Sequence, residues 1–157
     1  DLHSFPTRRS SDLGNYQVQS LGGTDSGEHF SFSNTHREVA HYLTPLLGQH
    51  QVDNAGLAIQ LCDLYCQSKQ LPLLTEDQVS AALLVTSWPG RMEQISNQPR
   101  ILLDGAHNPH AMEKLTATLN QHYQELDKKI LFSCIQTKSL EEMLGQLKQV
   151  QIGRAHV

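Results

Sequence analysis

The stretch Ile101-Leu-Leu-Asp-Gly-Ala-His-Asn-Pro109 decides how the second half of the chain is expected to fold. A short apolar run stops at Asp104, and Asn108-Pro109 then opens a helix. Asparagine is a favoured N-cap, and proline suits the first helical position because its missing N–H would be unpaired there anyway. Gly105 lets the backbone turn sharply and lets a ligand approach. The stretch therefore predicts a strand, a tight turn and a helix beginning at Pro109.

Two more elements are expected after this helix, which should end near Leu126. Residues 129–135 form an apolar run typical of a strand, and a last helix carries Leu140, Met143, Leu144 and Leu147. Together with a strand at Arg100–Leu103, the order is β-α-β-α, which favours a parallel sheet with right-handed crossovers. Two strands are too few for a stable doubly wound sheet, so we expect further strands beyond Gln151.

The turn after the first of these strands is a candidate ligand site. Open α/β sheets bind ligands at the carboxyl ends of their strands, and a helix N-terminus favours phosphate or carboxylate. We therefore expect Asp104 and His107 to point into such a crevice. The alternative is a capped turn in which both side chains are satisfied locally.

The first half of the chain predicts strands and then helices. Short alternating patterns at Tyr16–Val18 and Phe30–Phe32 indicate two strands joined by a loop over Leu21–Gly27, and Val39–Leu43 indicates a third. After Gly48 the apolar period becomes helical. We expect a helix from Asp53 to Gln67 with this buried face: Ala55, Ala58, Leu61, Cys62 and Tyr65.

A second helix is expected to begin at Thr75, because Thr-Glu-Asp-Gln78 has the pattern of a capping box. Pro89-Gly90 should end it, and Met92–Ile95 should form a short strand. A domain boundary plausibly falls in this region.

Composition excludes several classes of function. The chain has 157 residues, of which 38% are hydrophobic and 18% charged, as in globular domains. Its net charge is −4 and it has no basic stripe, which argues against nucleic-acid binding. No apolar run approaches the roughly 20 residues that span a bilayer. Three cysteines suggest reduced thiols and a cytoplasmic protein.

No metal site is expected in the chain. Cys62 and Cys66 share a helical face but lack two further convergent ligands. His107 and His110 lie on either side of the helix start at Pro109, which separates their directions.

Both ends of the chain are expected to be foreign to the protein. Ser4–Leu13 and Ile152–Val157 resemble translated sequencing-adaptor DNA. We therefore set residues 1–13 and 152–157 aside and expect both natural termini to be missing.

Three motifs occur in a fixed order: Leu-Leu-Gly-Gln-His-Gln-Val-Asp-Asn-Ala55, Trp-Pro-Gly-Arg-Met-Glu93 and Ile-Leu-Leu-Asp-Gly-Ala-His-Asn-Pro-His110. In this order they resemble the folylpolyglutamate synthase/dihydrofolate synthase family of the Mur ligase superfamily. The resemblance implies an α/β fold in which residues 14–90 are the C-terminal part of a central ATPase domain. Residues 91–151 would then be the beginning of a Rossmann-like C-terminal ligase domain.

The resemblance also implies a reaction and a set of site residues. An ATP- and Mg²⁺-dependent ligase would add L-glutamate to folate, and to dihydropteroate, through an acyl phosphate, and the enzyme would be a monomer. Asn54 and Arg91 would contact the adenine end of ATP and Asp104 would hold the nucleotide. His107 would act in catalysis near the phosphates or the incoming glutamate. The family's Gly-x-x-x-x-Gly-Lys-Ser/Thr phosphate loop, magnesium ligands and folate-binding residues are not in this sequence, so we expect the chain alone to be inactive.

Other interpretations stay open at this point. Taken singly, Arg91 is typical of a solvated loop residue after Pro-Gly, and Asn54 of a helix cap. The chain could also belong to a Mur-type ligase that adds an amino acid to a cell-wall precursor. A third interpretation is a non-catalytic nucleotide-binding module.

Overall fold

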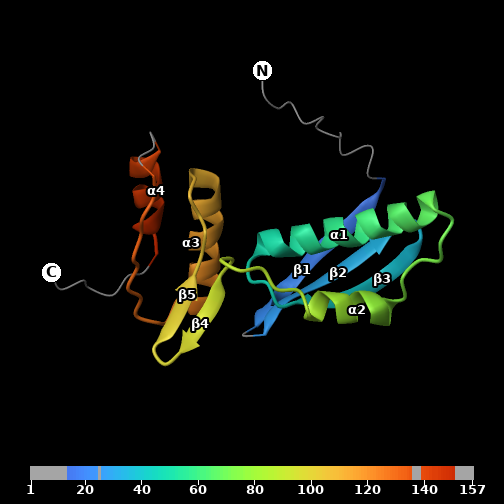
Figure 1. The fold of residues 1–157 in the computed structure, drawn as a ribbon, viewed down its shortest axis with the longest axis horizontal. Helices are drawn as coiled ribbons and strands as arrows, with labels where there is room; N and C mark the ends of the chain where they lie inside the picture. The colour runs from blue at the N-terminus through green and yellow to red at the C-terminus, as the bar shows by residue number, and fades with distance from the viewer. Residues whose placement is uncertain (1–13, 25, 136–138, 151–157) are drawn as a thin grey trace, which may run out of the picture.

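A computed structural model describes residues 14–24, 26–135 and 139–150. A three-stranded antiparallel sheet with two helices comes first in the chain. A β-hairpin with two further helices follows and lies at the other end of the molecule (Figure 1). The chain is therefore of mixed α and β structure, as the sequence predicts.

The sheet contains β1 (Tyr16–Thr24), β2 (Gly27–Asn34) and β3 (Arg37–Thr44) in that order. All three predicted strands are confirmed, but they extend further than expected. Most of the predicted loop over Leu21–Gly27 belongs to the ladder, which continues until Thr24 pairs with Gly27. A hairpin of antiparallel strands needs only a short turn, so the alternating pattern underestimated the strand lengths.

Two helices cover one face of this sheet. Helix α1 spans Gln49–Ser68 and helix α2 spans Glu76–Leu84. The core between helices and sheet is apolar and consists of Phe30, Phe32, Ala40, Tyr42, Val52, Ala55, Ile59 and Val79. The capping box of α2 is confirmed, since the Gln78 amide N–H donates to Thr75 Oγ1 at 3.2 Å and the Thr75 N–H donates to Gln78 Oε1 at 2.9 Å.

The predicted buried face of α1 is wrong. Ala58, Leu61, Cys62 and Tyr65 are exposed among the described residues, and the helix instead buries Gln51, Val52, Ala55, Gly56, Ile59, Gln60, Asp63 and Cys66. Three of these are polar, so a search for apolar periodicity does not find the face. Gly56 completes it because an added Cβ would lie 2.1 Å from Val18 Cγ2.

One of the polar residues of this face, Asp63, binds a buried arginine side chain. Asp63 is fully buried and accepts hydrogen bonds from Arg37 Nε and Nη2, both at 2.6 Å. Asn34 Nδ2 donates to Asp63 Oδ2 at 2.9 Å and to Gln60 Oε1 at 2.8 Å. The network ties α1 to the turn between β2 and β3.

The second half contains β4 (Glu93–Asn97), β5 (Arg100–Leu103), α3 (Pro109–Tyr123) and α4 (Leu140–Leu147). Strand β5 pairs with β4 in an antiparallel hairpin, and the predicted parallel pair of Arg100–Leu103 with residues 129–135 is not present in the described chain. Residues 129–135 form no ladder within the described chain. Burial nevertheless alternates toward the end of this segment, and Phe132 and Cys134 pack against the buried residues Met112, Met143 and Leu147. No strand pairs with this segment among the described residues, which the apolar pattern alone could not reveal.

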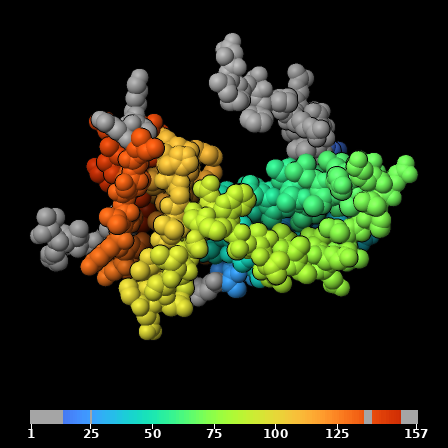
Figure 2. Space-filling model, in the orientation of Figure 1, coloured from blue at the N-terminus to red at the C-terminus, as the bar shows by residue number. Residues whose placement is uncertain are grey.

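The two halves have separate cores. Met112, Met143 and Leu147 form the second cluster, and it shares no residue with the first. Figure 2 shows the yellow-green residues that precede β4 lying across the junction between the halves. The domain boundary near residue 90 stays a prediction. In the described residues, no helix combines the length and apolarity needed to cross a membrane.

We predict that Asp63→Ala lowers the free energy of unfolding by about 3–5 kcal/mol, because it leaves the buried Arg37 guanidinium without its partner. Chemical denaturation followed by circular dichroism measures the change. Asp53→Ala, on an exposed position of the same helix, is the matched control and should change stability by less than about 0.5 kcal/mol. Equal effects of the two substitutions would contradict the prediction.

Candidate functional site

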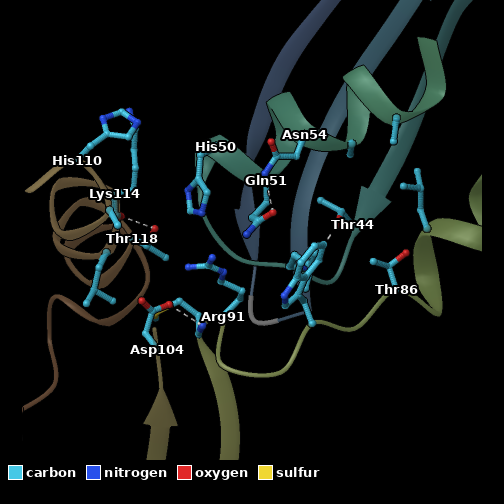
Figure 3. A pocket seen from close by; sticks show the side chains of 18 residues that line it. Thr44, His50, Gln51, Asn54, Thr86, Arg91, Asp104, His110, Lys114 and Thr118 are labelled. Carbon is cyan, nitrogen blue, oxygen red and sulfur yellow. Dashed lines mark hydrogen bonds between the residues drawn. The ribbon is translucent and has the colours of Figure 1, made fainter. Parts of the chain in front are cut away.

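A cavity of about 600 Å³ lies where the two halves meet (Figure 3). Its walls come from the end of β3 and the loop after it, the first turns of α1, the end of α2 with the segment before β4, the turn after β5, and α3. Its polar lining consists of Thr44, His50, Gln51, Asn54, Thr86, Arg91, Asp104, His110, Lys114 and Thr118.

Three of the four predicted site residues line this one cavity. Asn54 lies on α1, Arg91 precedes β4, and Asp104 follows β5. They are separated by up to 50 positions in the sequence, so only folding brings them together. His107 is not among the lining residues. It is exposed in the turn, with Nδ1 2.8 Å from the carbonyl oxygen of Gly105.

Hydrogen bonds hold the turn after β5 against the segment that precedes β4. Asp104 Oδ2 accepts the Met92 N–H at 3.0 Å and Asp104 Oδ1 accepts the Ala106 N–H at 2.8 Å. The Gly105 N–H donates to the carbonyl of Gly90 at 2.8 Å. Met92 has a φ of 47°, a left-handed conformation that costs energy in a residue with a side chain and persists only where its surroundings hold it. Asp104 and Gly105 together thus hold the backbone on both sides of Arg91.

The start of α3 is built as the sequence predicts. Asn108 is the N-cap and its Oδ1 accepts the Ala111 N–H at 2.8 Å, and Pro109 occupies the first turn. From this start, helical spacing places His110, Ala111, Lys114 and Thr118 along the cavity.

The charged groups of the cavity are only partly balanced. Neither Arg91 nor Lys114 has a carboxylate within ion-pair distance among the described residues. Asp104 is the one acidic side chain of the lining, and both of its oxygens bind backbone N–H groups. Two cations facing one carboxylate suit an anionic ligand.

His50 belongs to the same group of charges. Burial lowers its pKa below the ordinary value, Asp104 opposes that shift, and the positive charges of Lys114 and Arg91 reinforce it. The imidazole is therefore biased toward its neutral form, in which one ring nitrogen donates and the other accepts a hydrogen bond.

Sequence reasoning missed His50, Gln51 and Lys114. The helix was expected to begin at Asp53, whereas it begins at Gln49 and places His50 and Gln51 one turn before Asn54, on the same wall. Lys114 lies four positions after His110, so the helical period counted from the Asn108 cap was the signal that could have found it.

The site does not fit Mg²⁺. Magnesium prefers several oxygen ligands in octahedral geometry, and the described residues contain no cluster of three or more side chains that could hold a metal. Asp104 alone, with its oxygens already bonded, is no substitute for such a cluster.

We predict that His50 titrates below the ordinary histidine value of about 6.5 and that Lys114→Gln raises its pKa by removing a nearby positive charge. Nuclear magnetic resonance of the histidine ring protons measures both values. Because the folded pKa lies below the unfolded one, His50 stabilises the fold fully above pH ~6.5 and loses this contribution as the pH falls from there through the folded pKa. Lys69→Gln, at the far end of α1, should leave the pKa unchanged. A wild-type value at or above 6.5 would contradict the prediction.

Comparison with known proteins shows which families the chain is similar to. The family described as Mur ligase, glutamate ligase domain, matches residues 90–154. The dihydrofolate synthase/folylpolyglutamate synthase of Bacillus subtilis is 30% identical over 125 residues, which are 80% of this chain and 29% of that protein. The folylpolyglutamate synthase of Lacticaseibacillus casei is 32% identical over 99 residues, 63% of this chain and 23% of that protein.

A solved FPGS–AMPPCP–folate complex superposes on 87% of this chain and 33% of its own, with 26% identity and a TM-score of 0.78. The chain thus spans less than a third of the two curated relatives' length. The similarity in sequence extends over 80% of this chain and the similarity in fold over 87%. The chain belongs to the folylpolyglutamate synthase/dihydrofolate synthase family of Mur ligases.

Proposed function

We propose that this chain supplies one wall of the nucleotide site of an ATP-dependent ligase that adds L-glutamate to folate, and to dihydropteroate. The observation that carries the proposal is the convergence of Asn54, Arg91 and Asp104 on one cavity. The names of the relatives, which are folylpolyglutamate and dihydrofolate synthases, support the choice of substrate. They favour this reading over a cell-wall ligase or a non-catalytic module.

Each residue has a chemical use toward a nucleotide. The Asn54 amide can both donate to and accept from a base edge, and the planar Arg91 guanidinium can stack on a base or bind phosphate. The Asp104 carboxylate keeps lone pairs free after its two backbone bonds and can accept from ribose hydroxyls. Lys114 adds a positive charge on the α3 side of the same cavity.

In the proposed reaction, a carboxylate oxygen of the folate attacks the γ-phosphorus of ATP and ADP leaves. The amino nitrogen of glutamate then attacks the acyl phosphate, losing a proton as the amide forms and phosphate departs. Such chemistry depends on positioning and on stabilisation of negative charge. The chain's own part would be to hold the nucleotide, and the catalytic role of His107 stays a prediction. We further infer a cytoplasmic, monomeric enzyme that uses Mg²⁺ held by residues outside this cavity.

We predict that Arg91→Ala and Asp104→Ala each weaken AMPPCP binding to the chain roughly tenfold, since a hydrogen bond to a charged group contributes about 1.5–3 kcal/mol. Isothermal titration calorimetry measures the affinity, and near-ultraviolet circular dichroism checks that the turn held by Asp104 stays folded. Arg100→Ala is the matched control, because Arg100 lies outside the cavity with its Cζ 5.7 Å from the ring centroid of Tyr123. Affinities unchanged by both substitutions would remove the site assignment.

We also predict that the 157-residue chain alone shows no glutamate-dependent ATP hydrolysis, because its sequence lacks the Gly-x-x-x-x-Gly-Lys-Ser/Thr loop that binds phosphates. A protein that carries both this segment and such a loop should release ADP only when glutamate and folate or dihydropteroate are supplied together. Release with a nucleotide-linked sugar peptide in place of the folate would instead identify a cell-wall ligase. Clear turnover by the chain alone would contradict the prediction.

A further inference from the structure

A buried carboxylate joins the two halves of the molecule outside the cavity. Glu28, near the start of β2, has no solvent exposure. Its Oε1 accepts the Gly48 N–H at 2.7 Å and lies 2.6 Å from His122 Nε2. Its Oε2 accepts a longer hydrogen bond from Gln121 Nε2 at 3.4 Å. The His122 side chain is itself only 6% exposed.

These partners come from two other elements. Gly48 is the N-cap residue of α1, whereas Gln121 and His122 lie in the last turn of α3, more than 90 positions from Glu28. With Glu28 as a carboxylate, which only accepts hydrogen bonds, His122 Nε2 is the donor in this contact. One side chain therefore ties β2, α1 and α3 together.

Glycines allow this close approach. A Cβ added at Gly23 of β1 would lie 2.3 Å from His122 Cε1 and 2.7 Å from Glu28 Oε2. A Cβ added at Gly48 would lie 2.5 Å from Thr118 Oγ1 of α3. Gly48 also has a φ of 105°, which residues with a side chain rarely adopt. These two glycines thus allow the backbone of the half that contains the three-stranded sheet, the sheet half, to lie close to α3.

No shared apolar core replaces this contact in the described residues, because the two hydrophobic clusters have no member in common. The cavity needs both halves, since α1 supplies His50 and Asn54 while α3 supplies Lys114. Thr118, one turn before His122, lines the cavity and also lies next to Gly48. The position of α3 against α1 therefore sets the distance between the two cavity walls.

We propose that Glu28 and His122 are a positioning pair that holds α3 against the sheet half and so keeps the two walls of the cavity face to face. A buried pair is suited to this task because removing one partner leaves the other without compensation, which makes a partly formed contact unfavourable. The pair does not touch the proposed ligand and acts through α1 and α3. Only the identity of that ligand rests on the proposed function.

Distances between spin labels on α1 and α3 of the whole chain test the pair. Native Cys62 on α1 and Ala117→Cys on α3 are both exposed positions for the labels, in a background of Cys66→Ala and Cys134→Ala. With Glu28 and His122 intact we expect one narrow distance distribution. His122→Ala and Glu28→Ala should broaden it and shift it to longer distances, whereas an unchanged distribution would overturn the proposal.

Matched variants separate positioning from general destabilisation. His122→Gln keeps a side-chain donor and should restore much of the narrow distribution. Gly23→Ala keeps both partners but pushes into the His122 ring, so it should open the contact without removing a charge. Exposed His36→Ala, Glu38→Ala and the α4 substitution Gly145→Ala, which meets nothing within 4 Å, are controls that should have no effect. If Gly23→Ala and the controls give the same distribution, the proposal fails.

Nucleotide affinity is the second measurement. With AMPPCP as the probe, we expect His122→Ala to weaken binding roughly tenfold, within the usual range of coupling between separate sites, and His122→Gln to recover most of the affinity. Unchanged affinity despite separated labels would show that the pair does not position the cavity walls. If the chain with an intact pair binds no AMPPCP, the proposed function fails, and the label distances still decide whether the pair holds α3.

Discussion

The arrangement of this molecule depends on the hydrogen bonds accepted by one buried carboxylate. Glu28 receives the backbone N–H that precedes α1 and the ring nitrogen of His122 at the end of α3. Each half has its own apolar core, so hydrophobic burial stabilises the halves but does not by itself orient them. Hydrogen bonds are directional, and a buried acceptor that loses its donors is costly. The geometry between the halves therefore rests on polar contacts.

A second carboxylate, that of Asp104, also holds separate backbone segments together, and it does so at the cavity. Asp104 bonds the backbone of Met92 and Ala106, and this fixes the loop that carries Arg91. The same side chain lines the cavity. The two interpretations offered by the sequence, a satisfied turn residue and a ligand-binding residue, are thus compatible, because two hydrogen bonds use only part of the accepting capacity of a carboxylate.

Local chemistry predicted much of the structure correctly. The capping box at Thr75, the N-cap at Asn108 and the first-turn proline at Pro109 are all present, because caps are decided by a few neighbouring residues. The strands expected at Tyr16–Val18, Phe30–Phe32 and Val39–Leu43 also form. The buried face of α1 was predicted wrongly because two of its polar members, Gln60 and Asp63, are satisfied by Asn34 and Arg37 from another part of the chain. No local pattern reports a partner that is more than 20 positions away.

The sequence by itself determined where α2 and α3 begin, the class of fold and three motifs whose residues Asn54, Arg91 and Asp104 were expected to form a site. Only the tertiary structure decided that these three line one cavity, that His107 points elsewhere, and that His50 and Lys114 join them. It also decided that β5 pairs with β4 and that, among the described residues, no strand pairs with residues 129–135. The physical reason is that capping and periodicity act within a few residues, whereas strand pairing, the burial of Glu28 and the width of a cavity depend on contacts between distant segments.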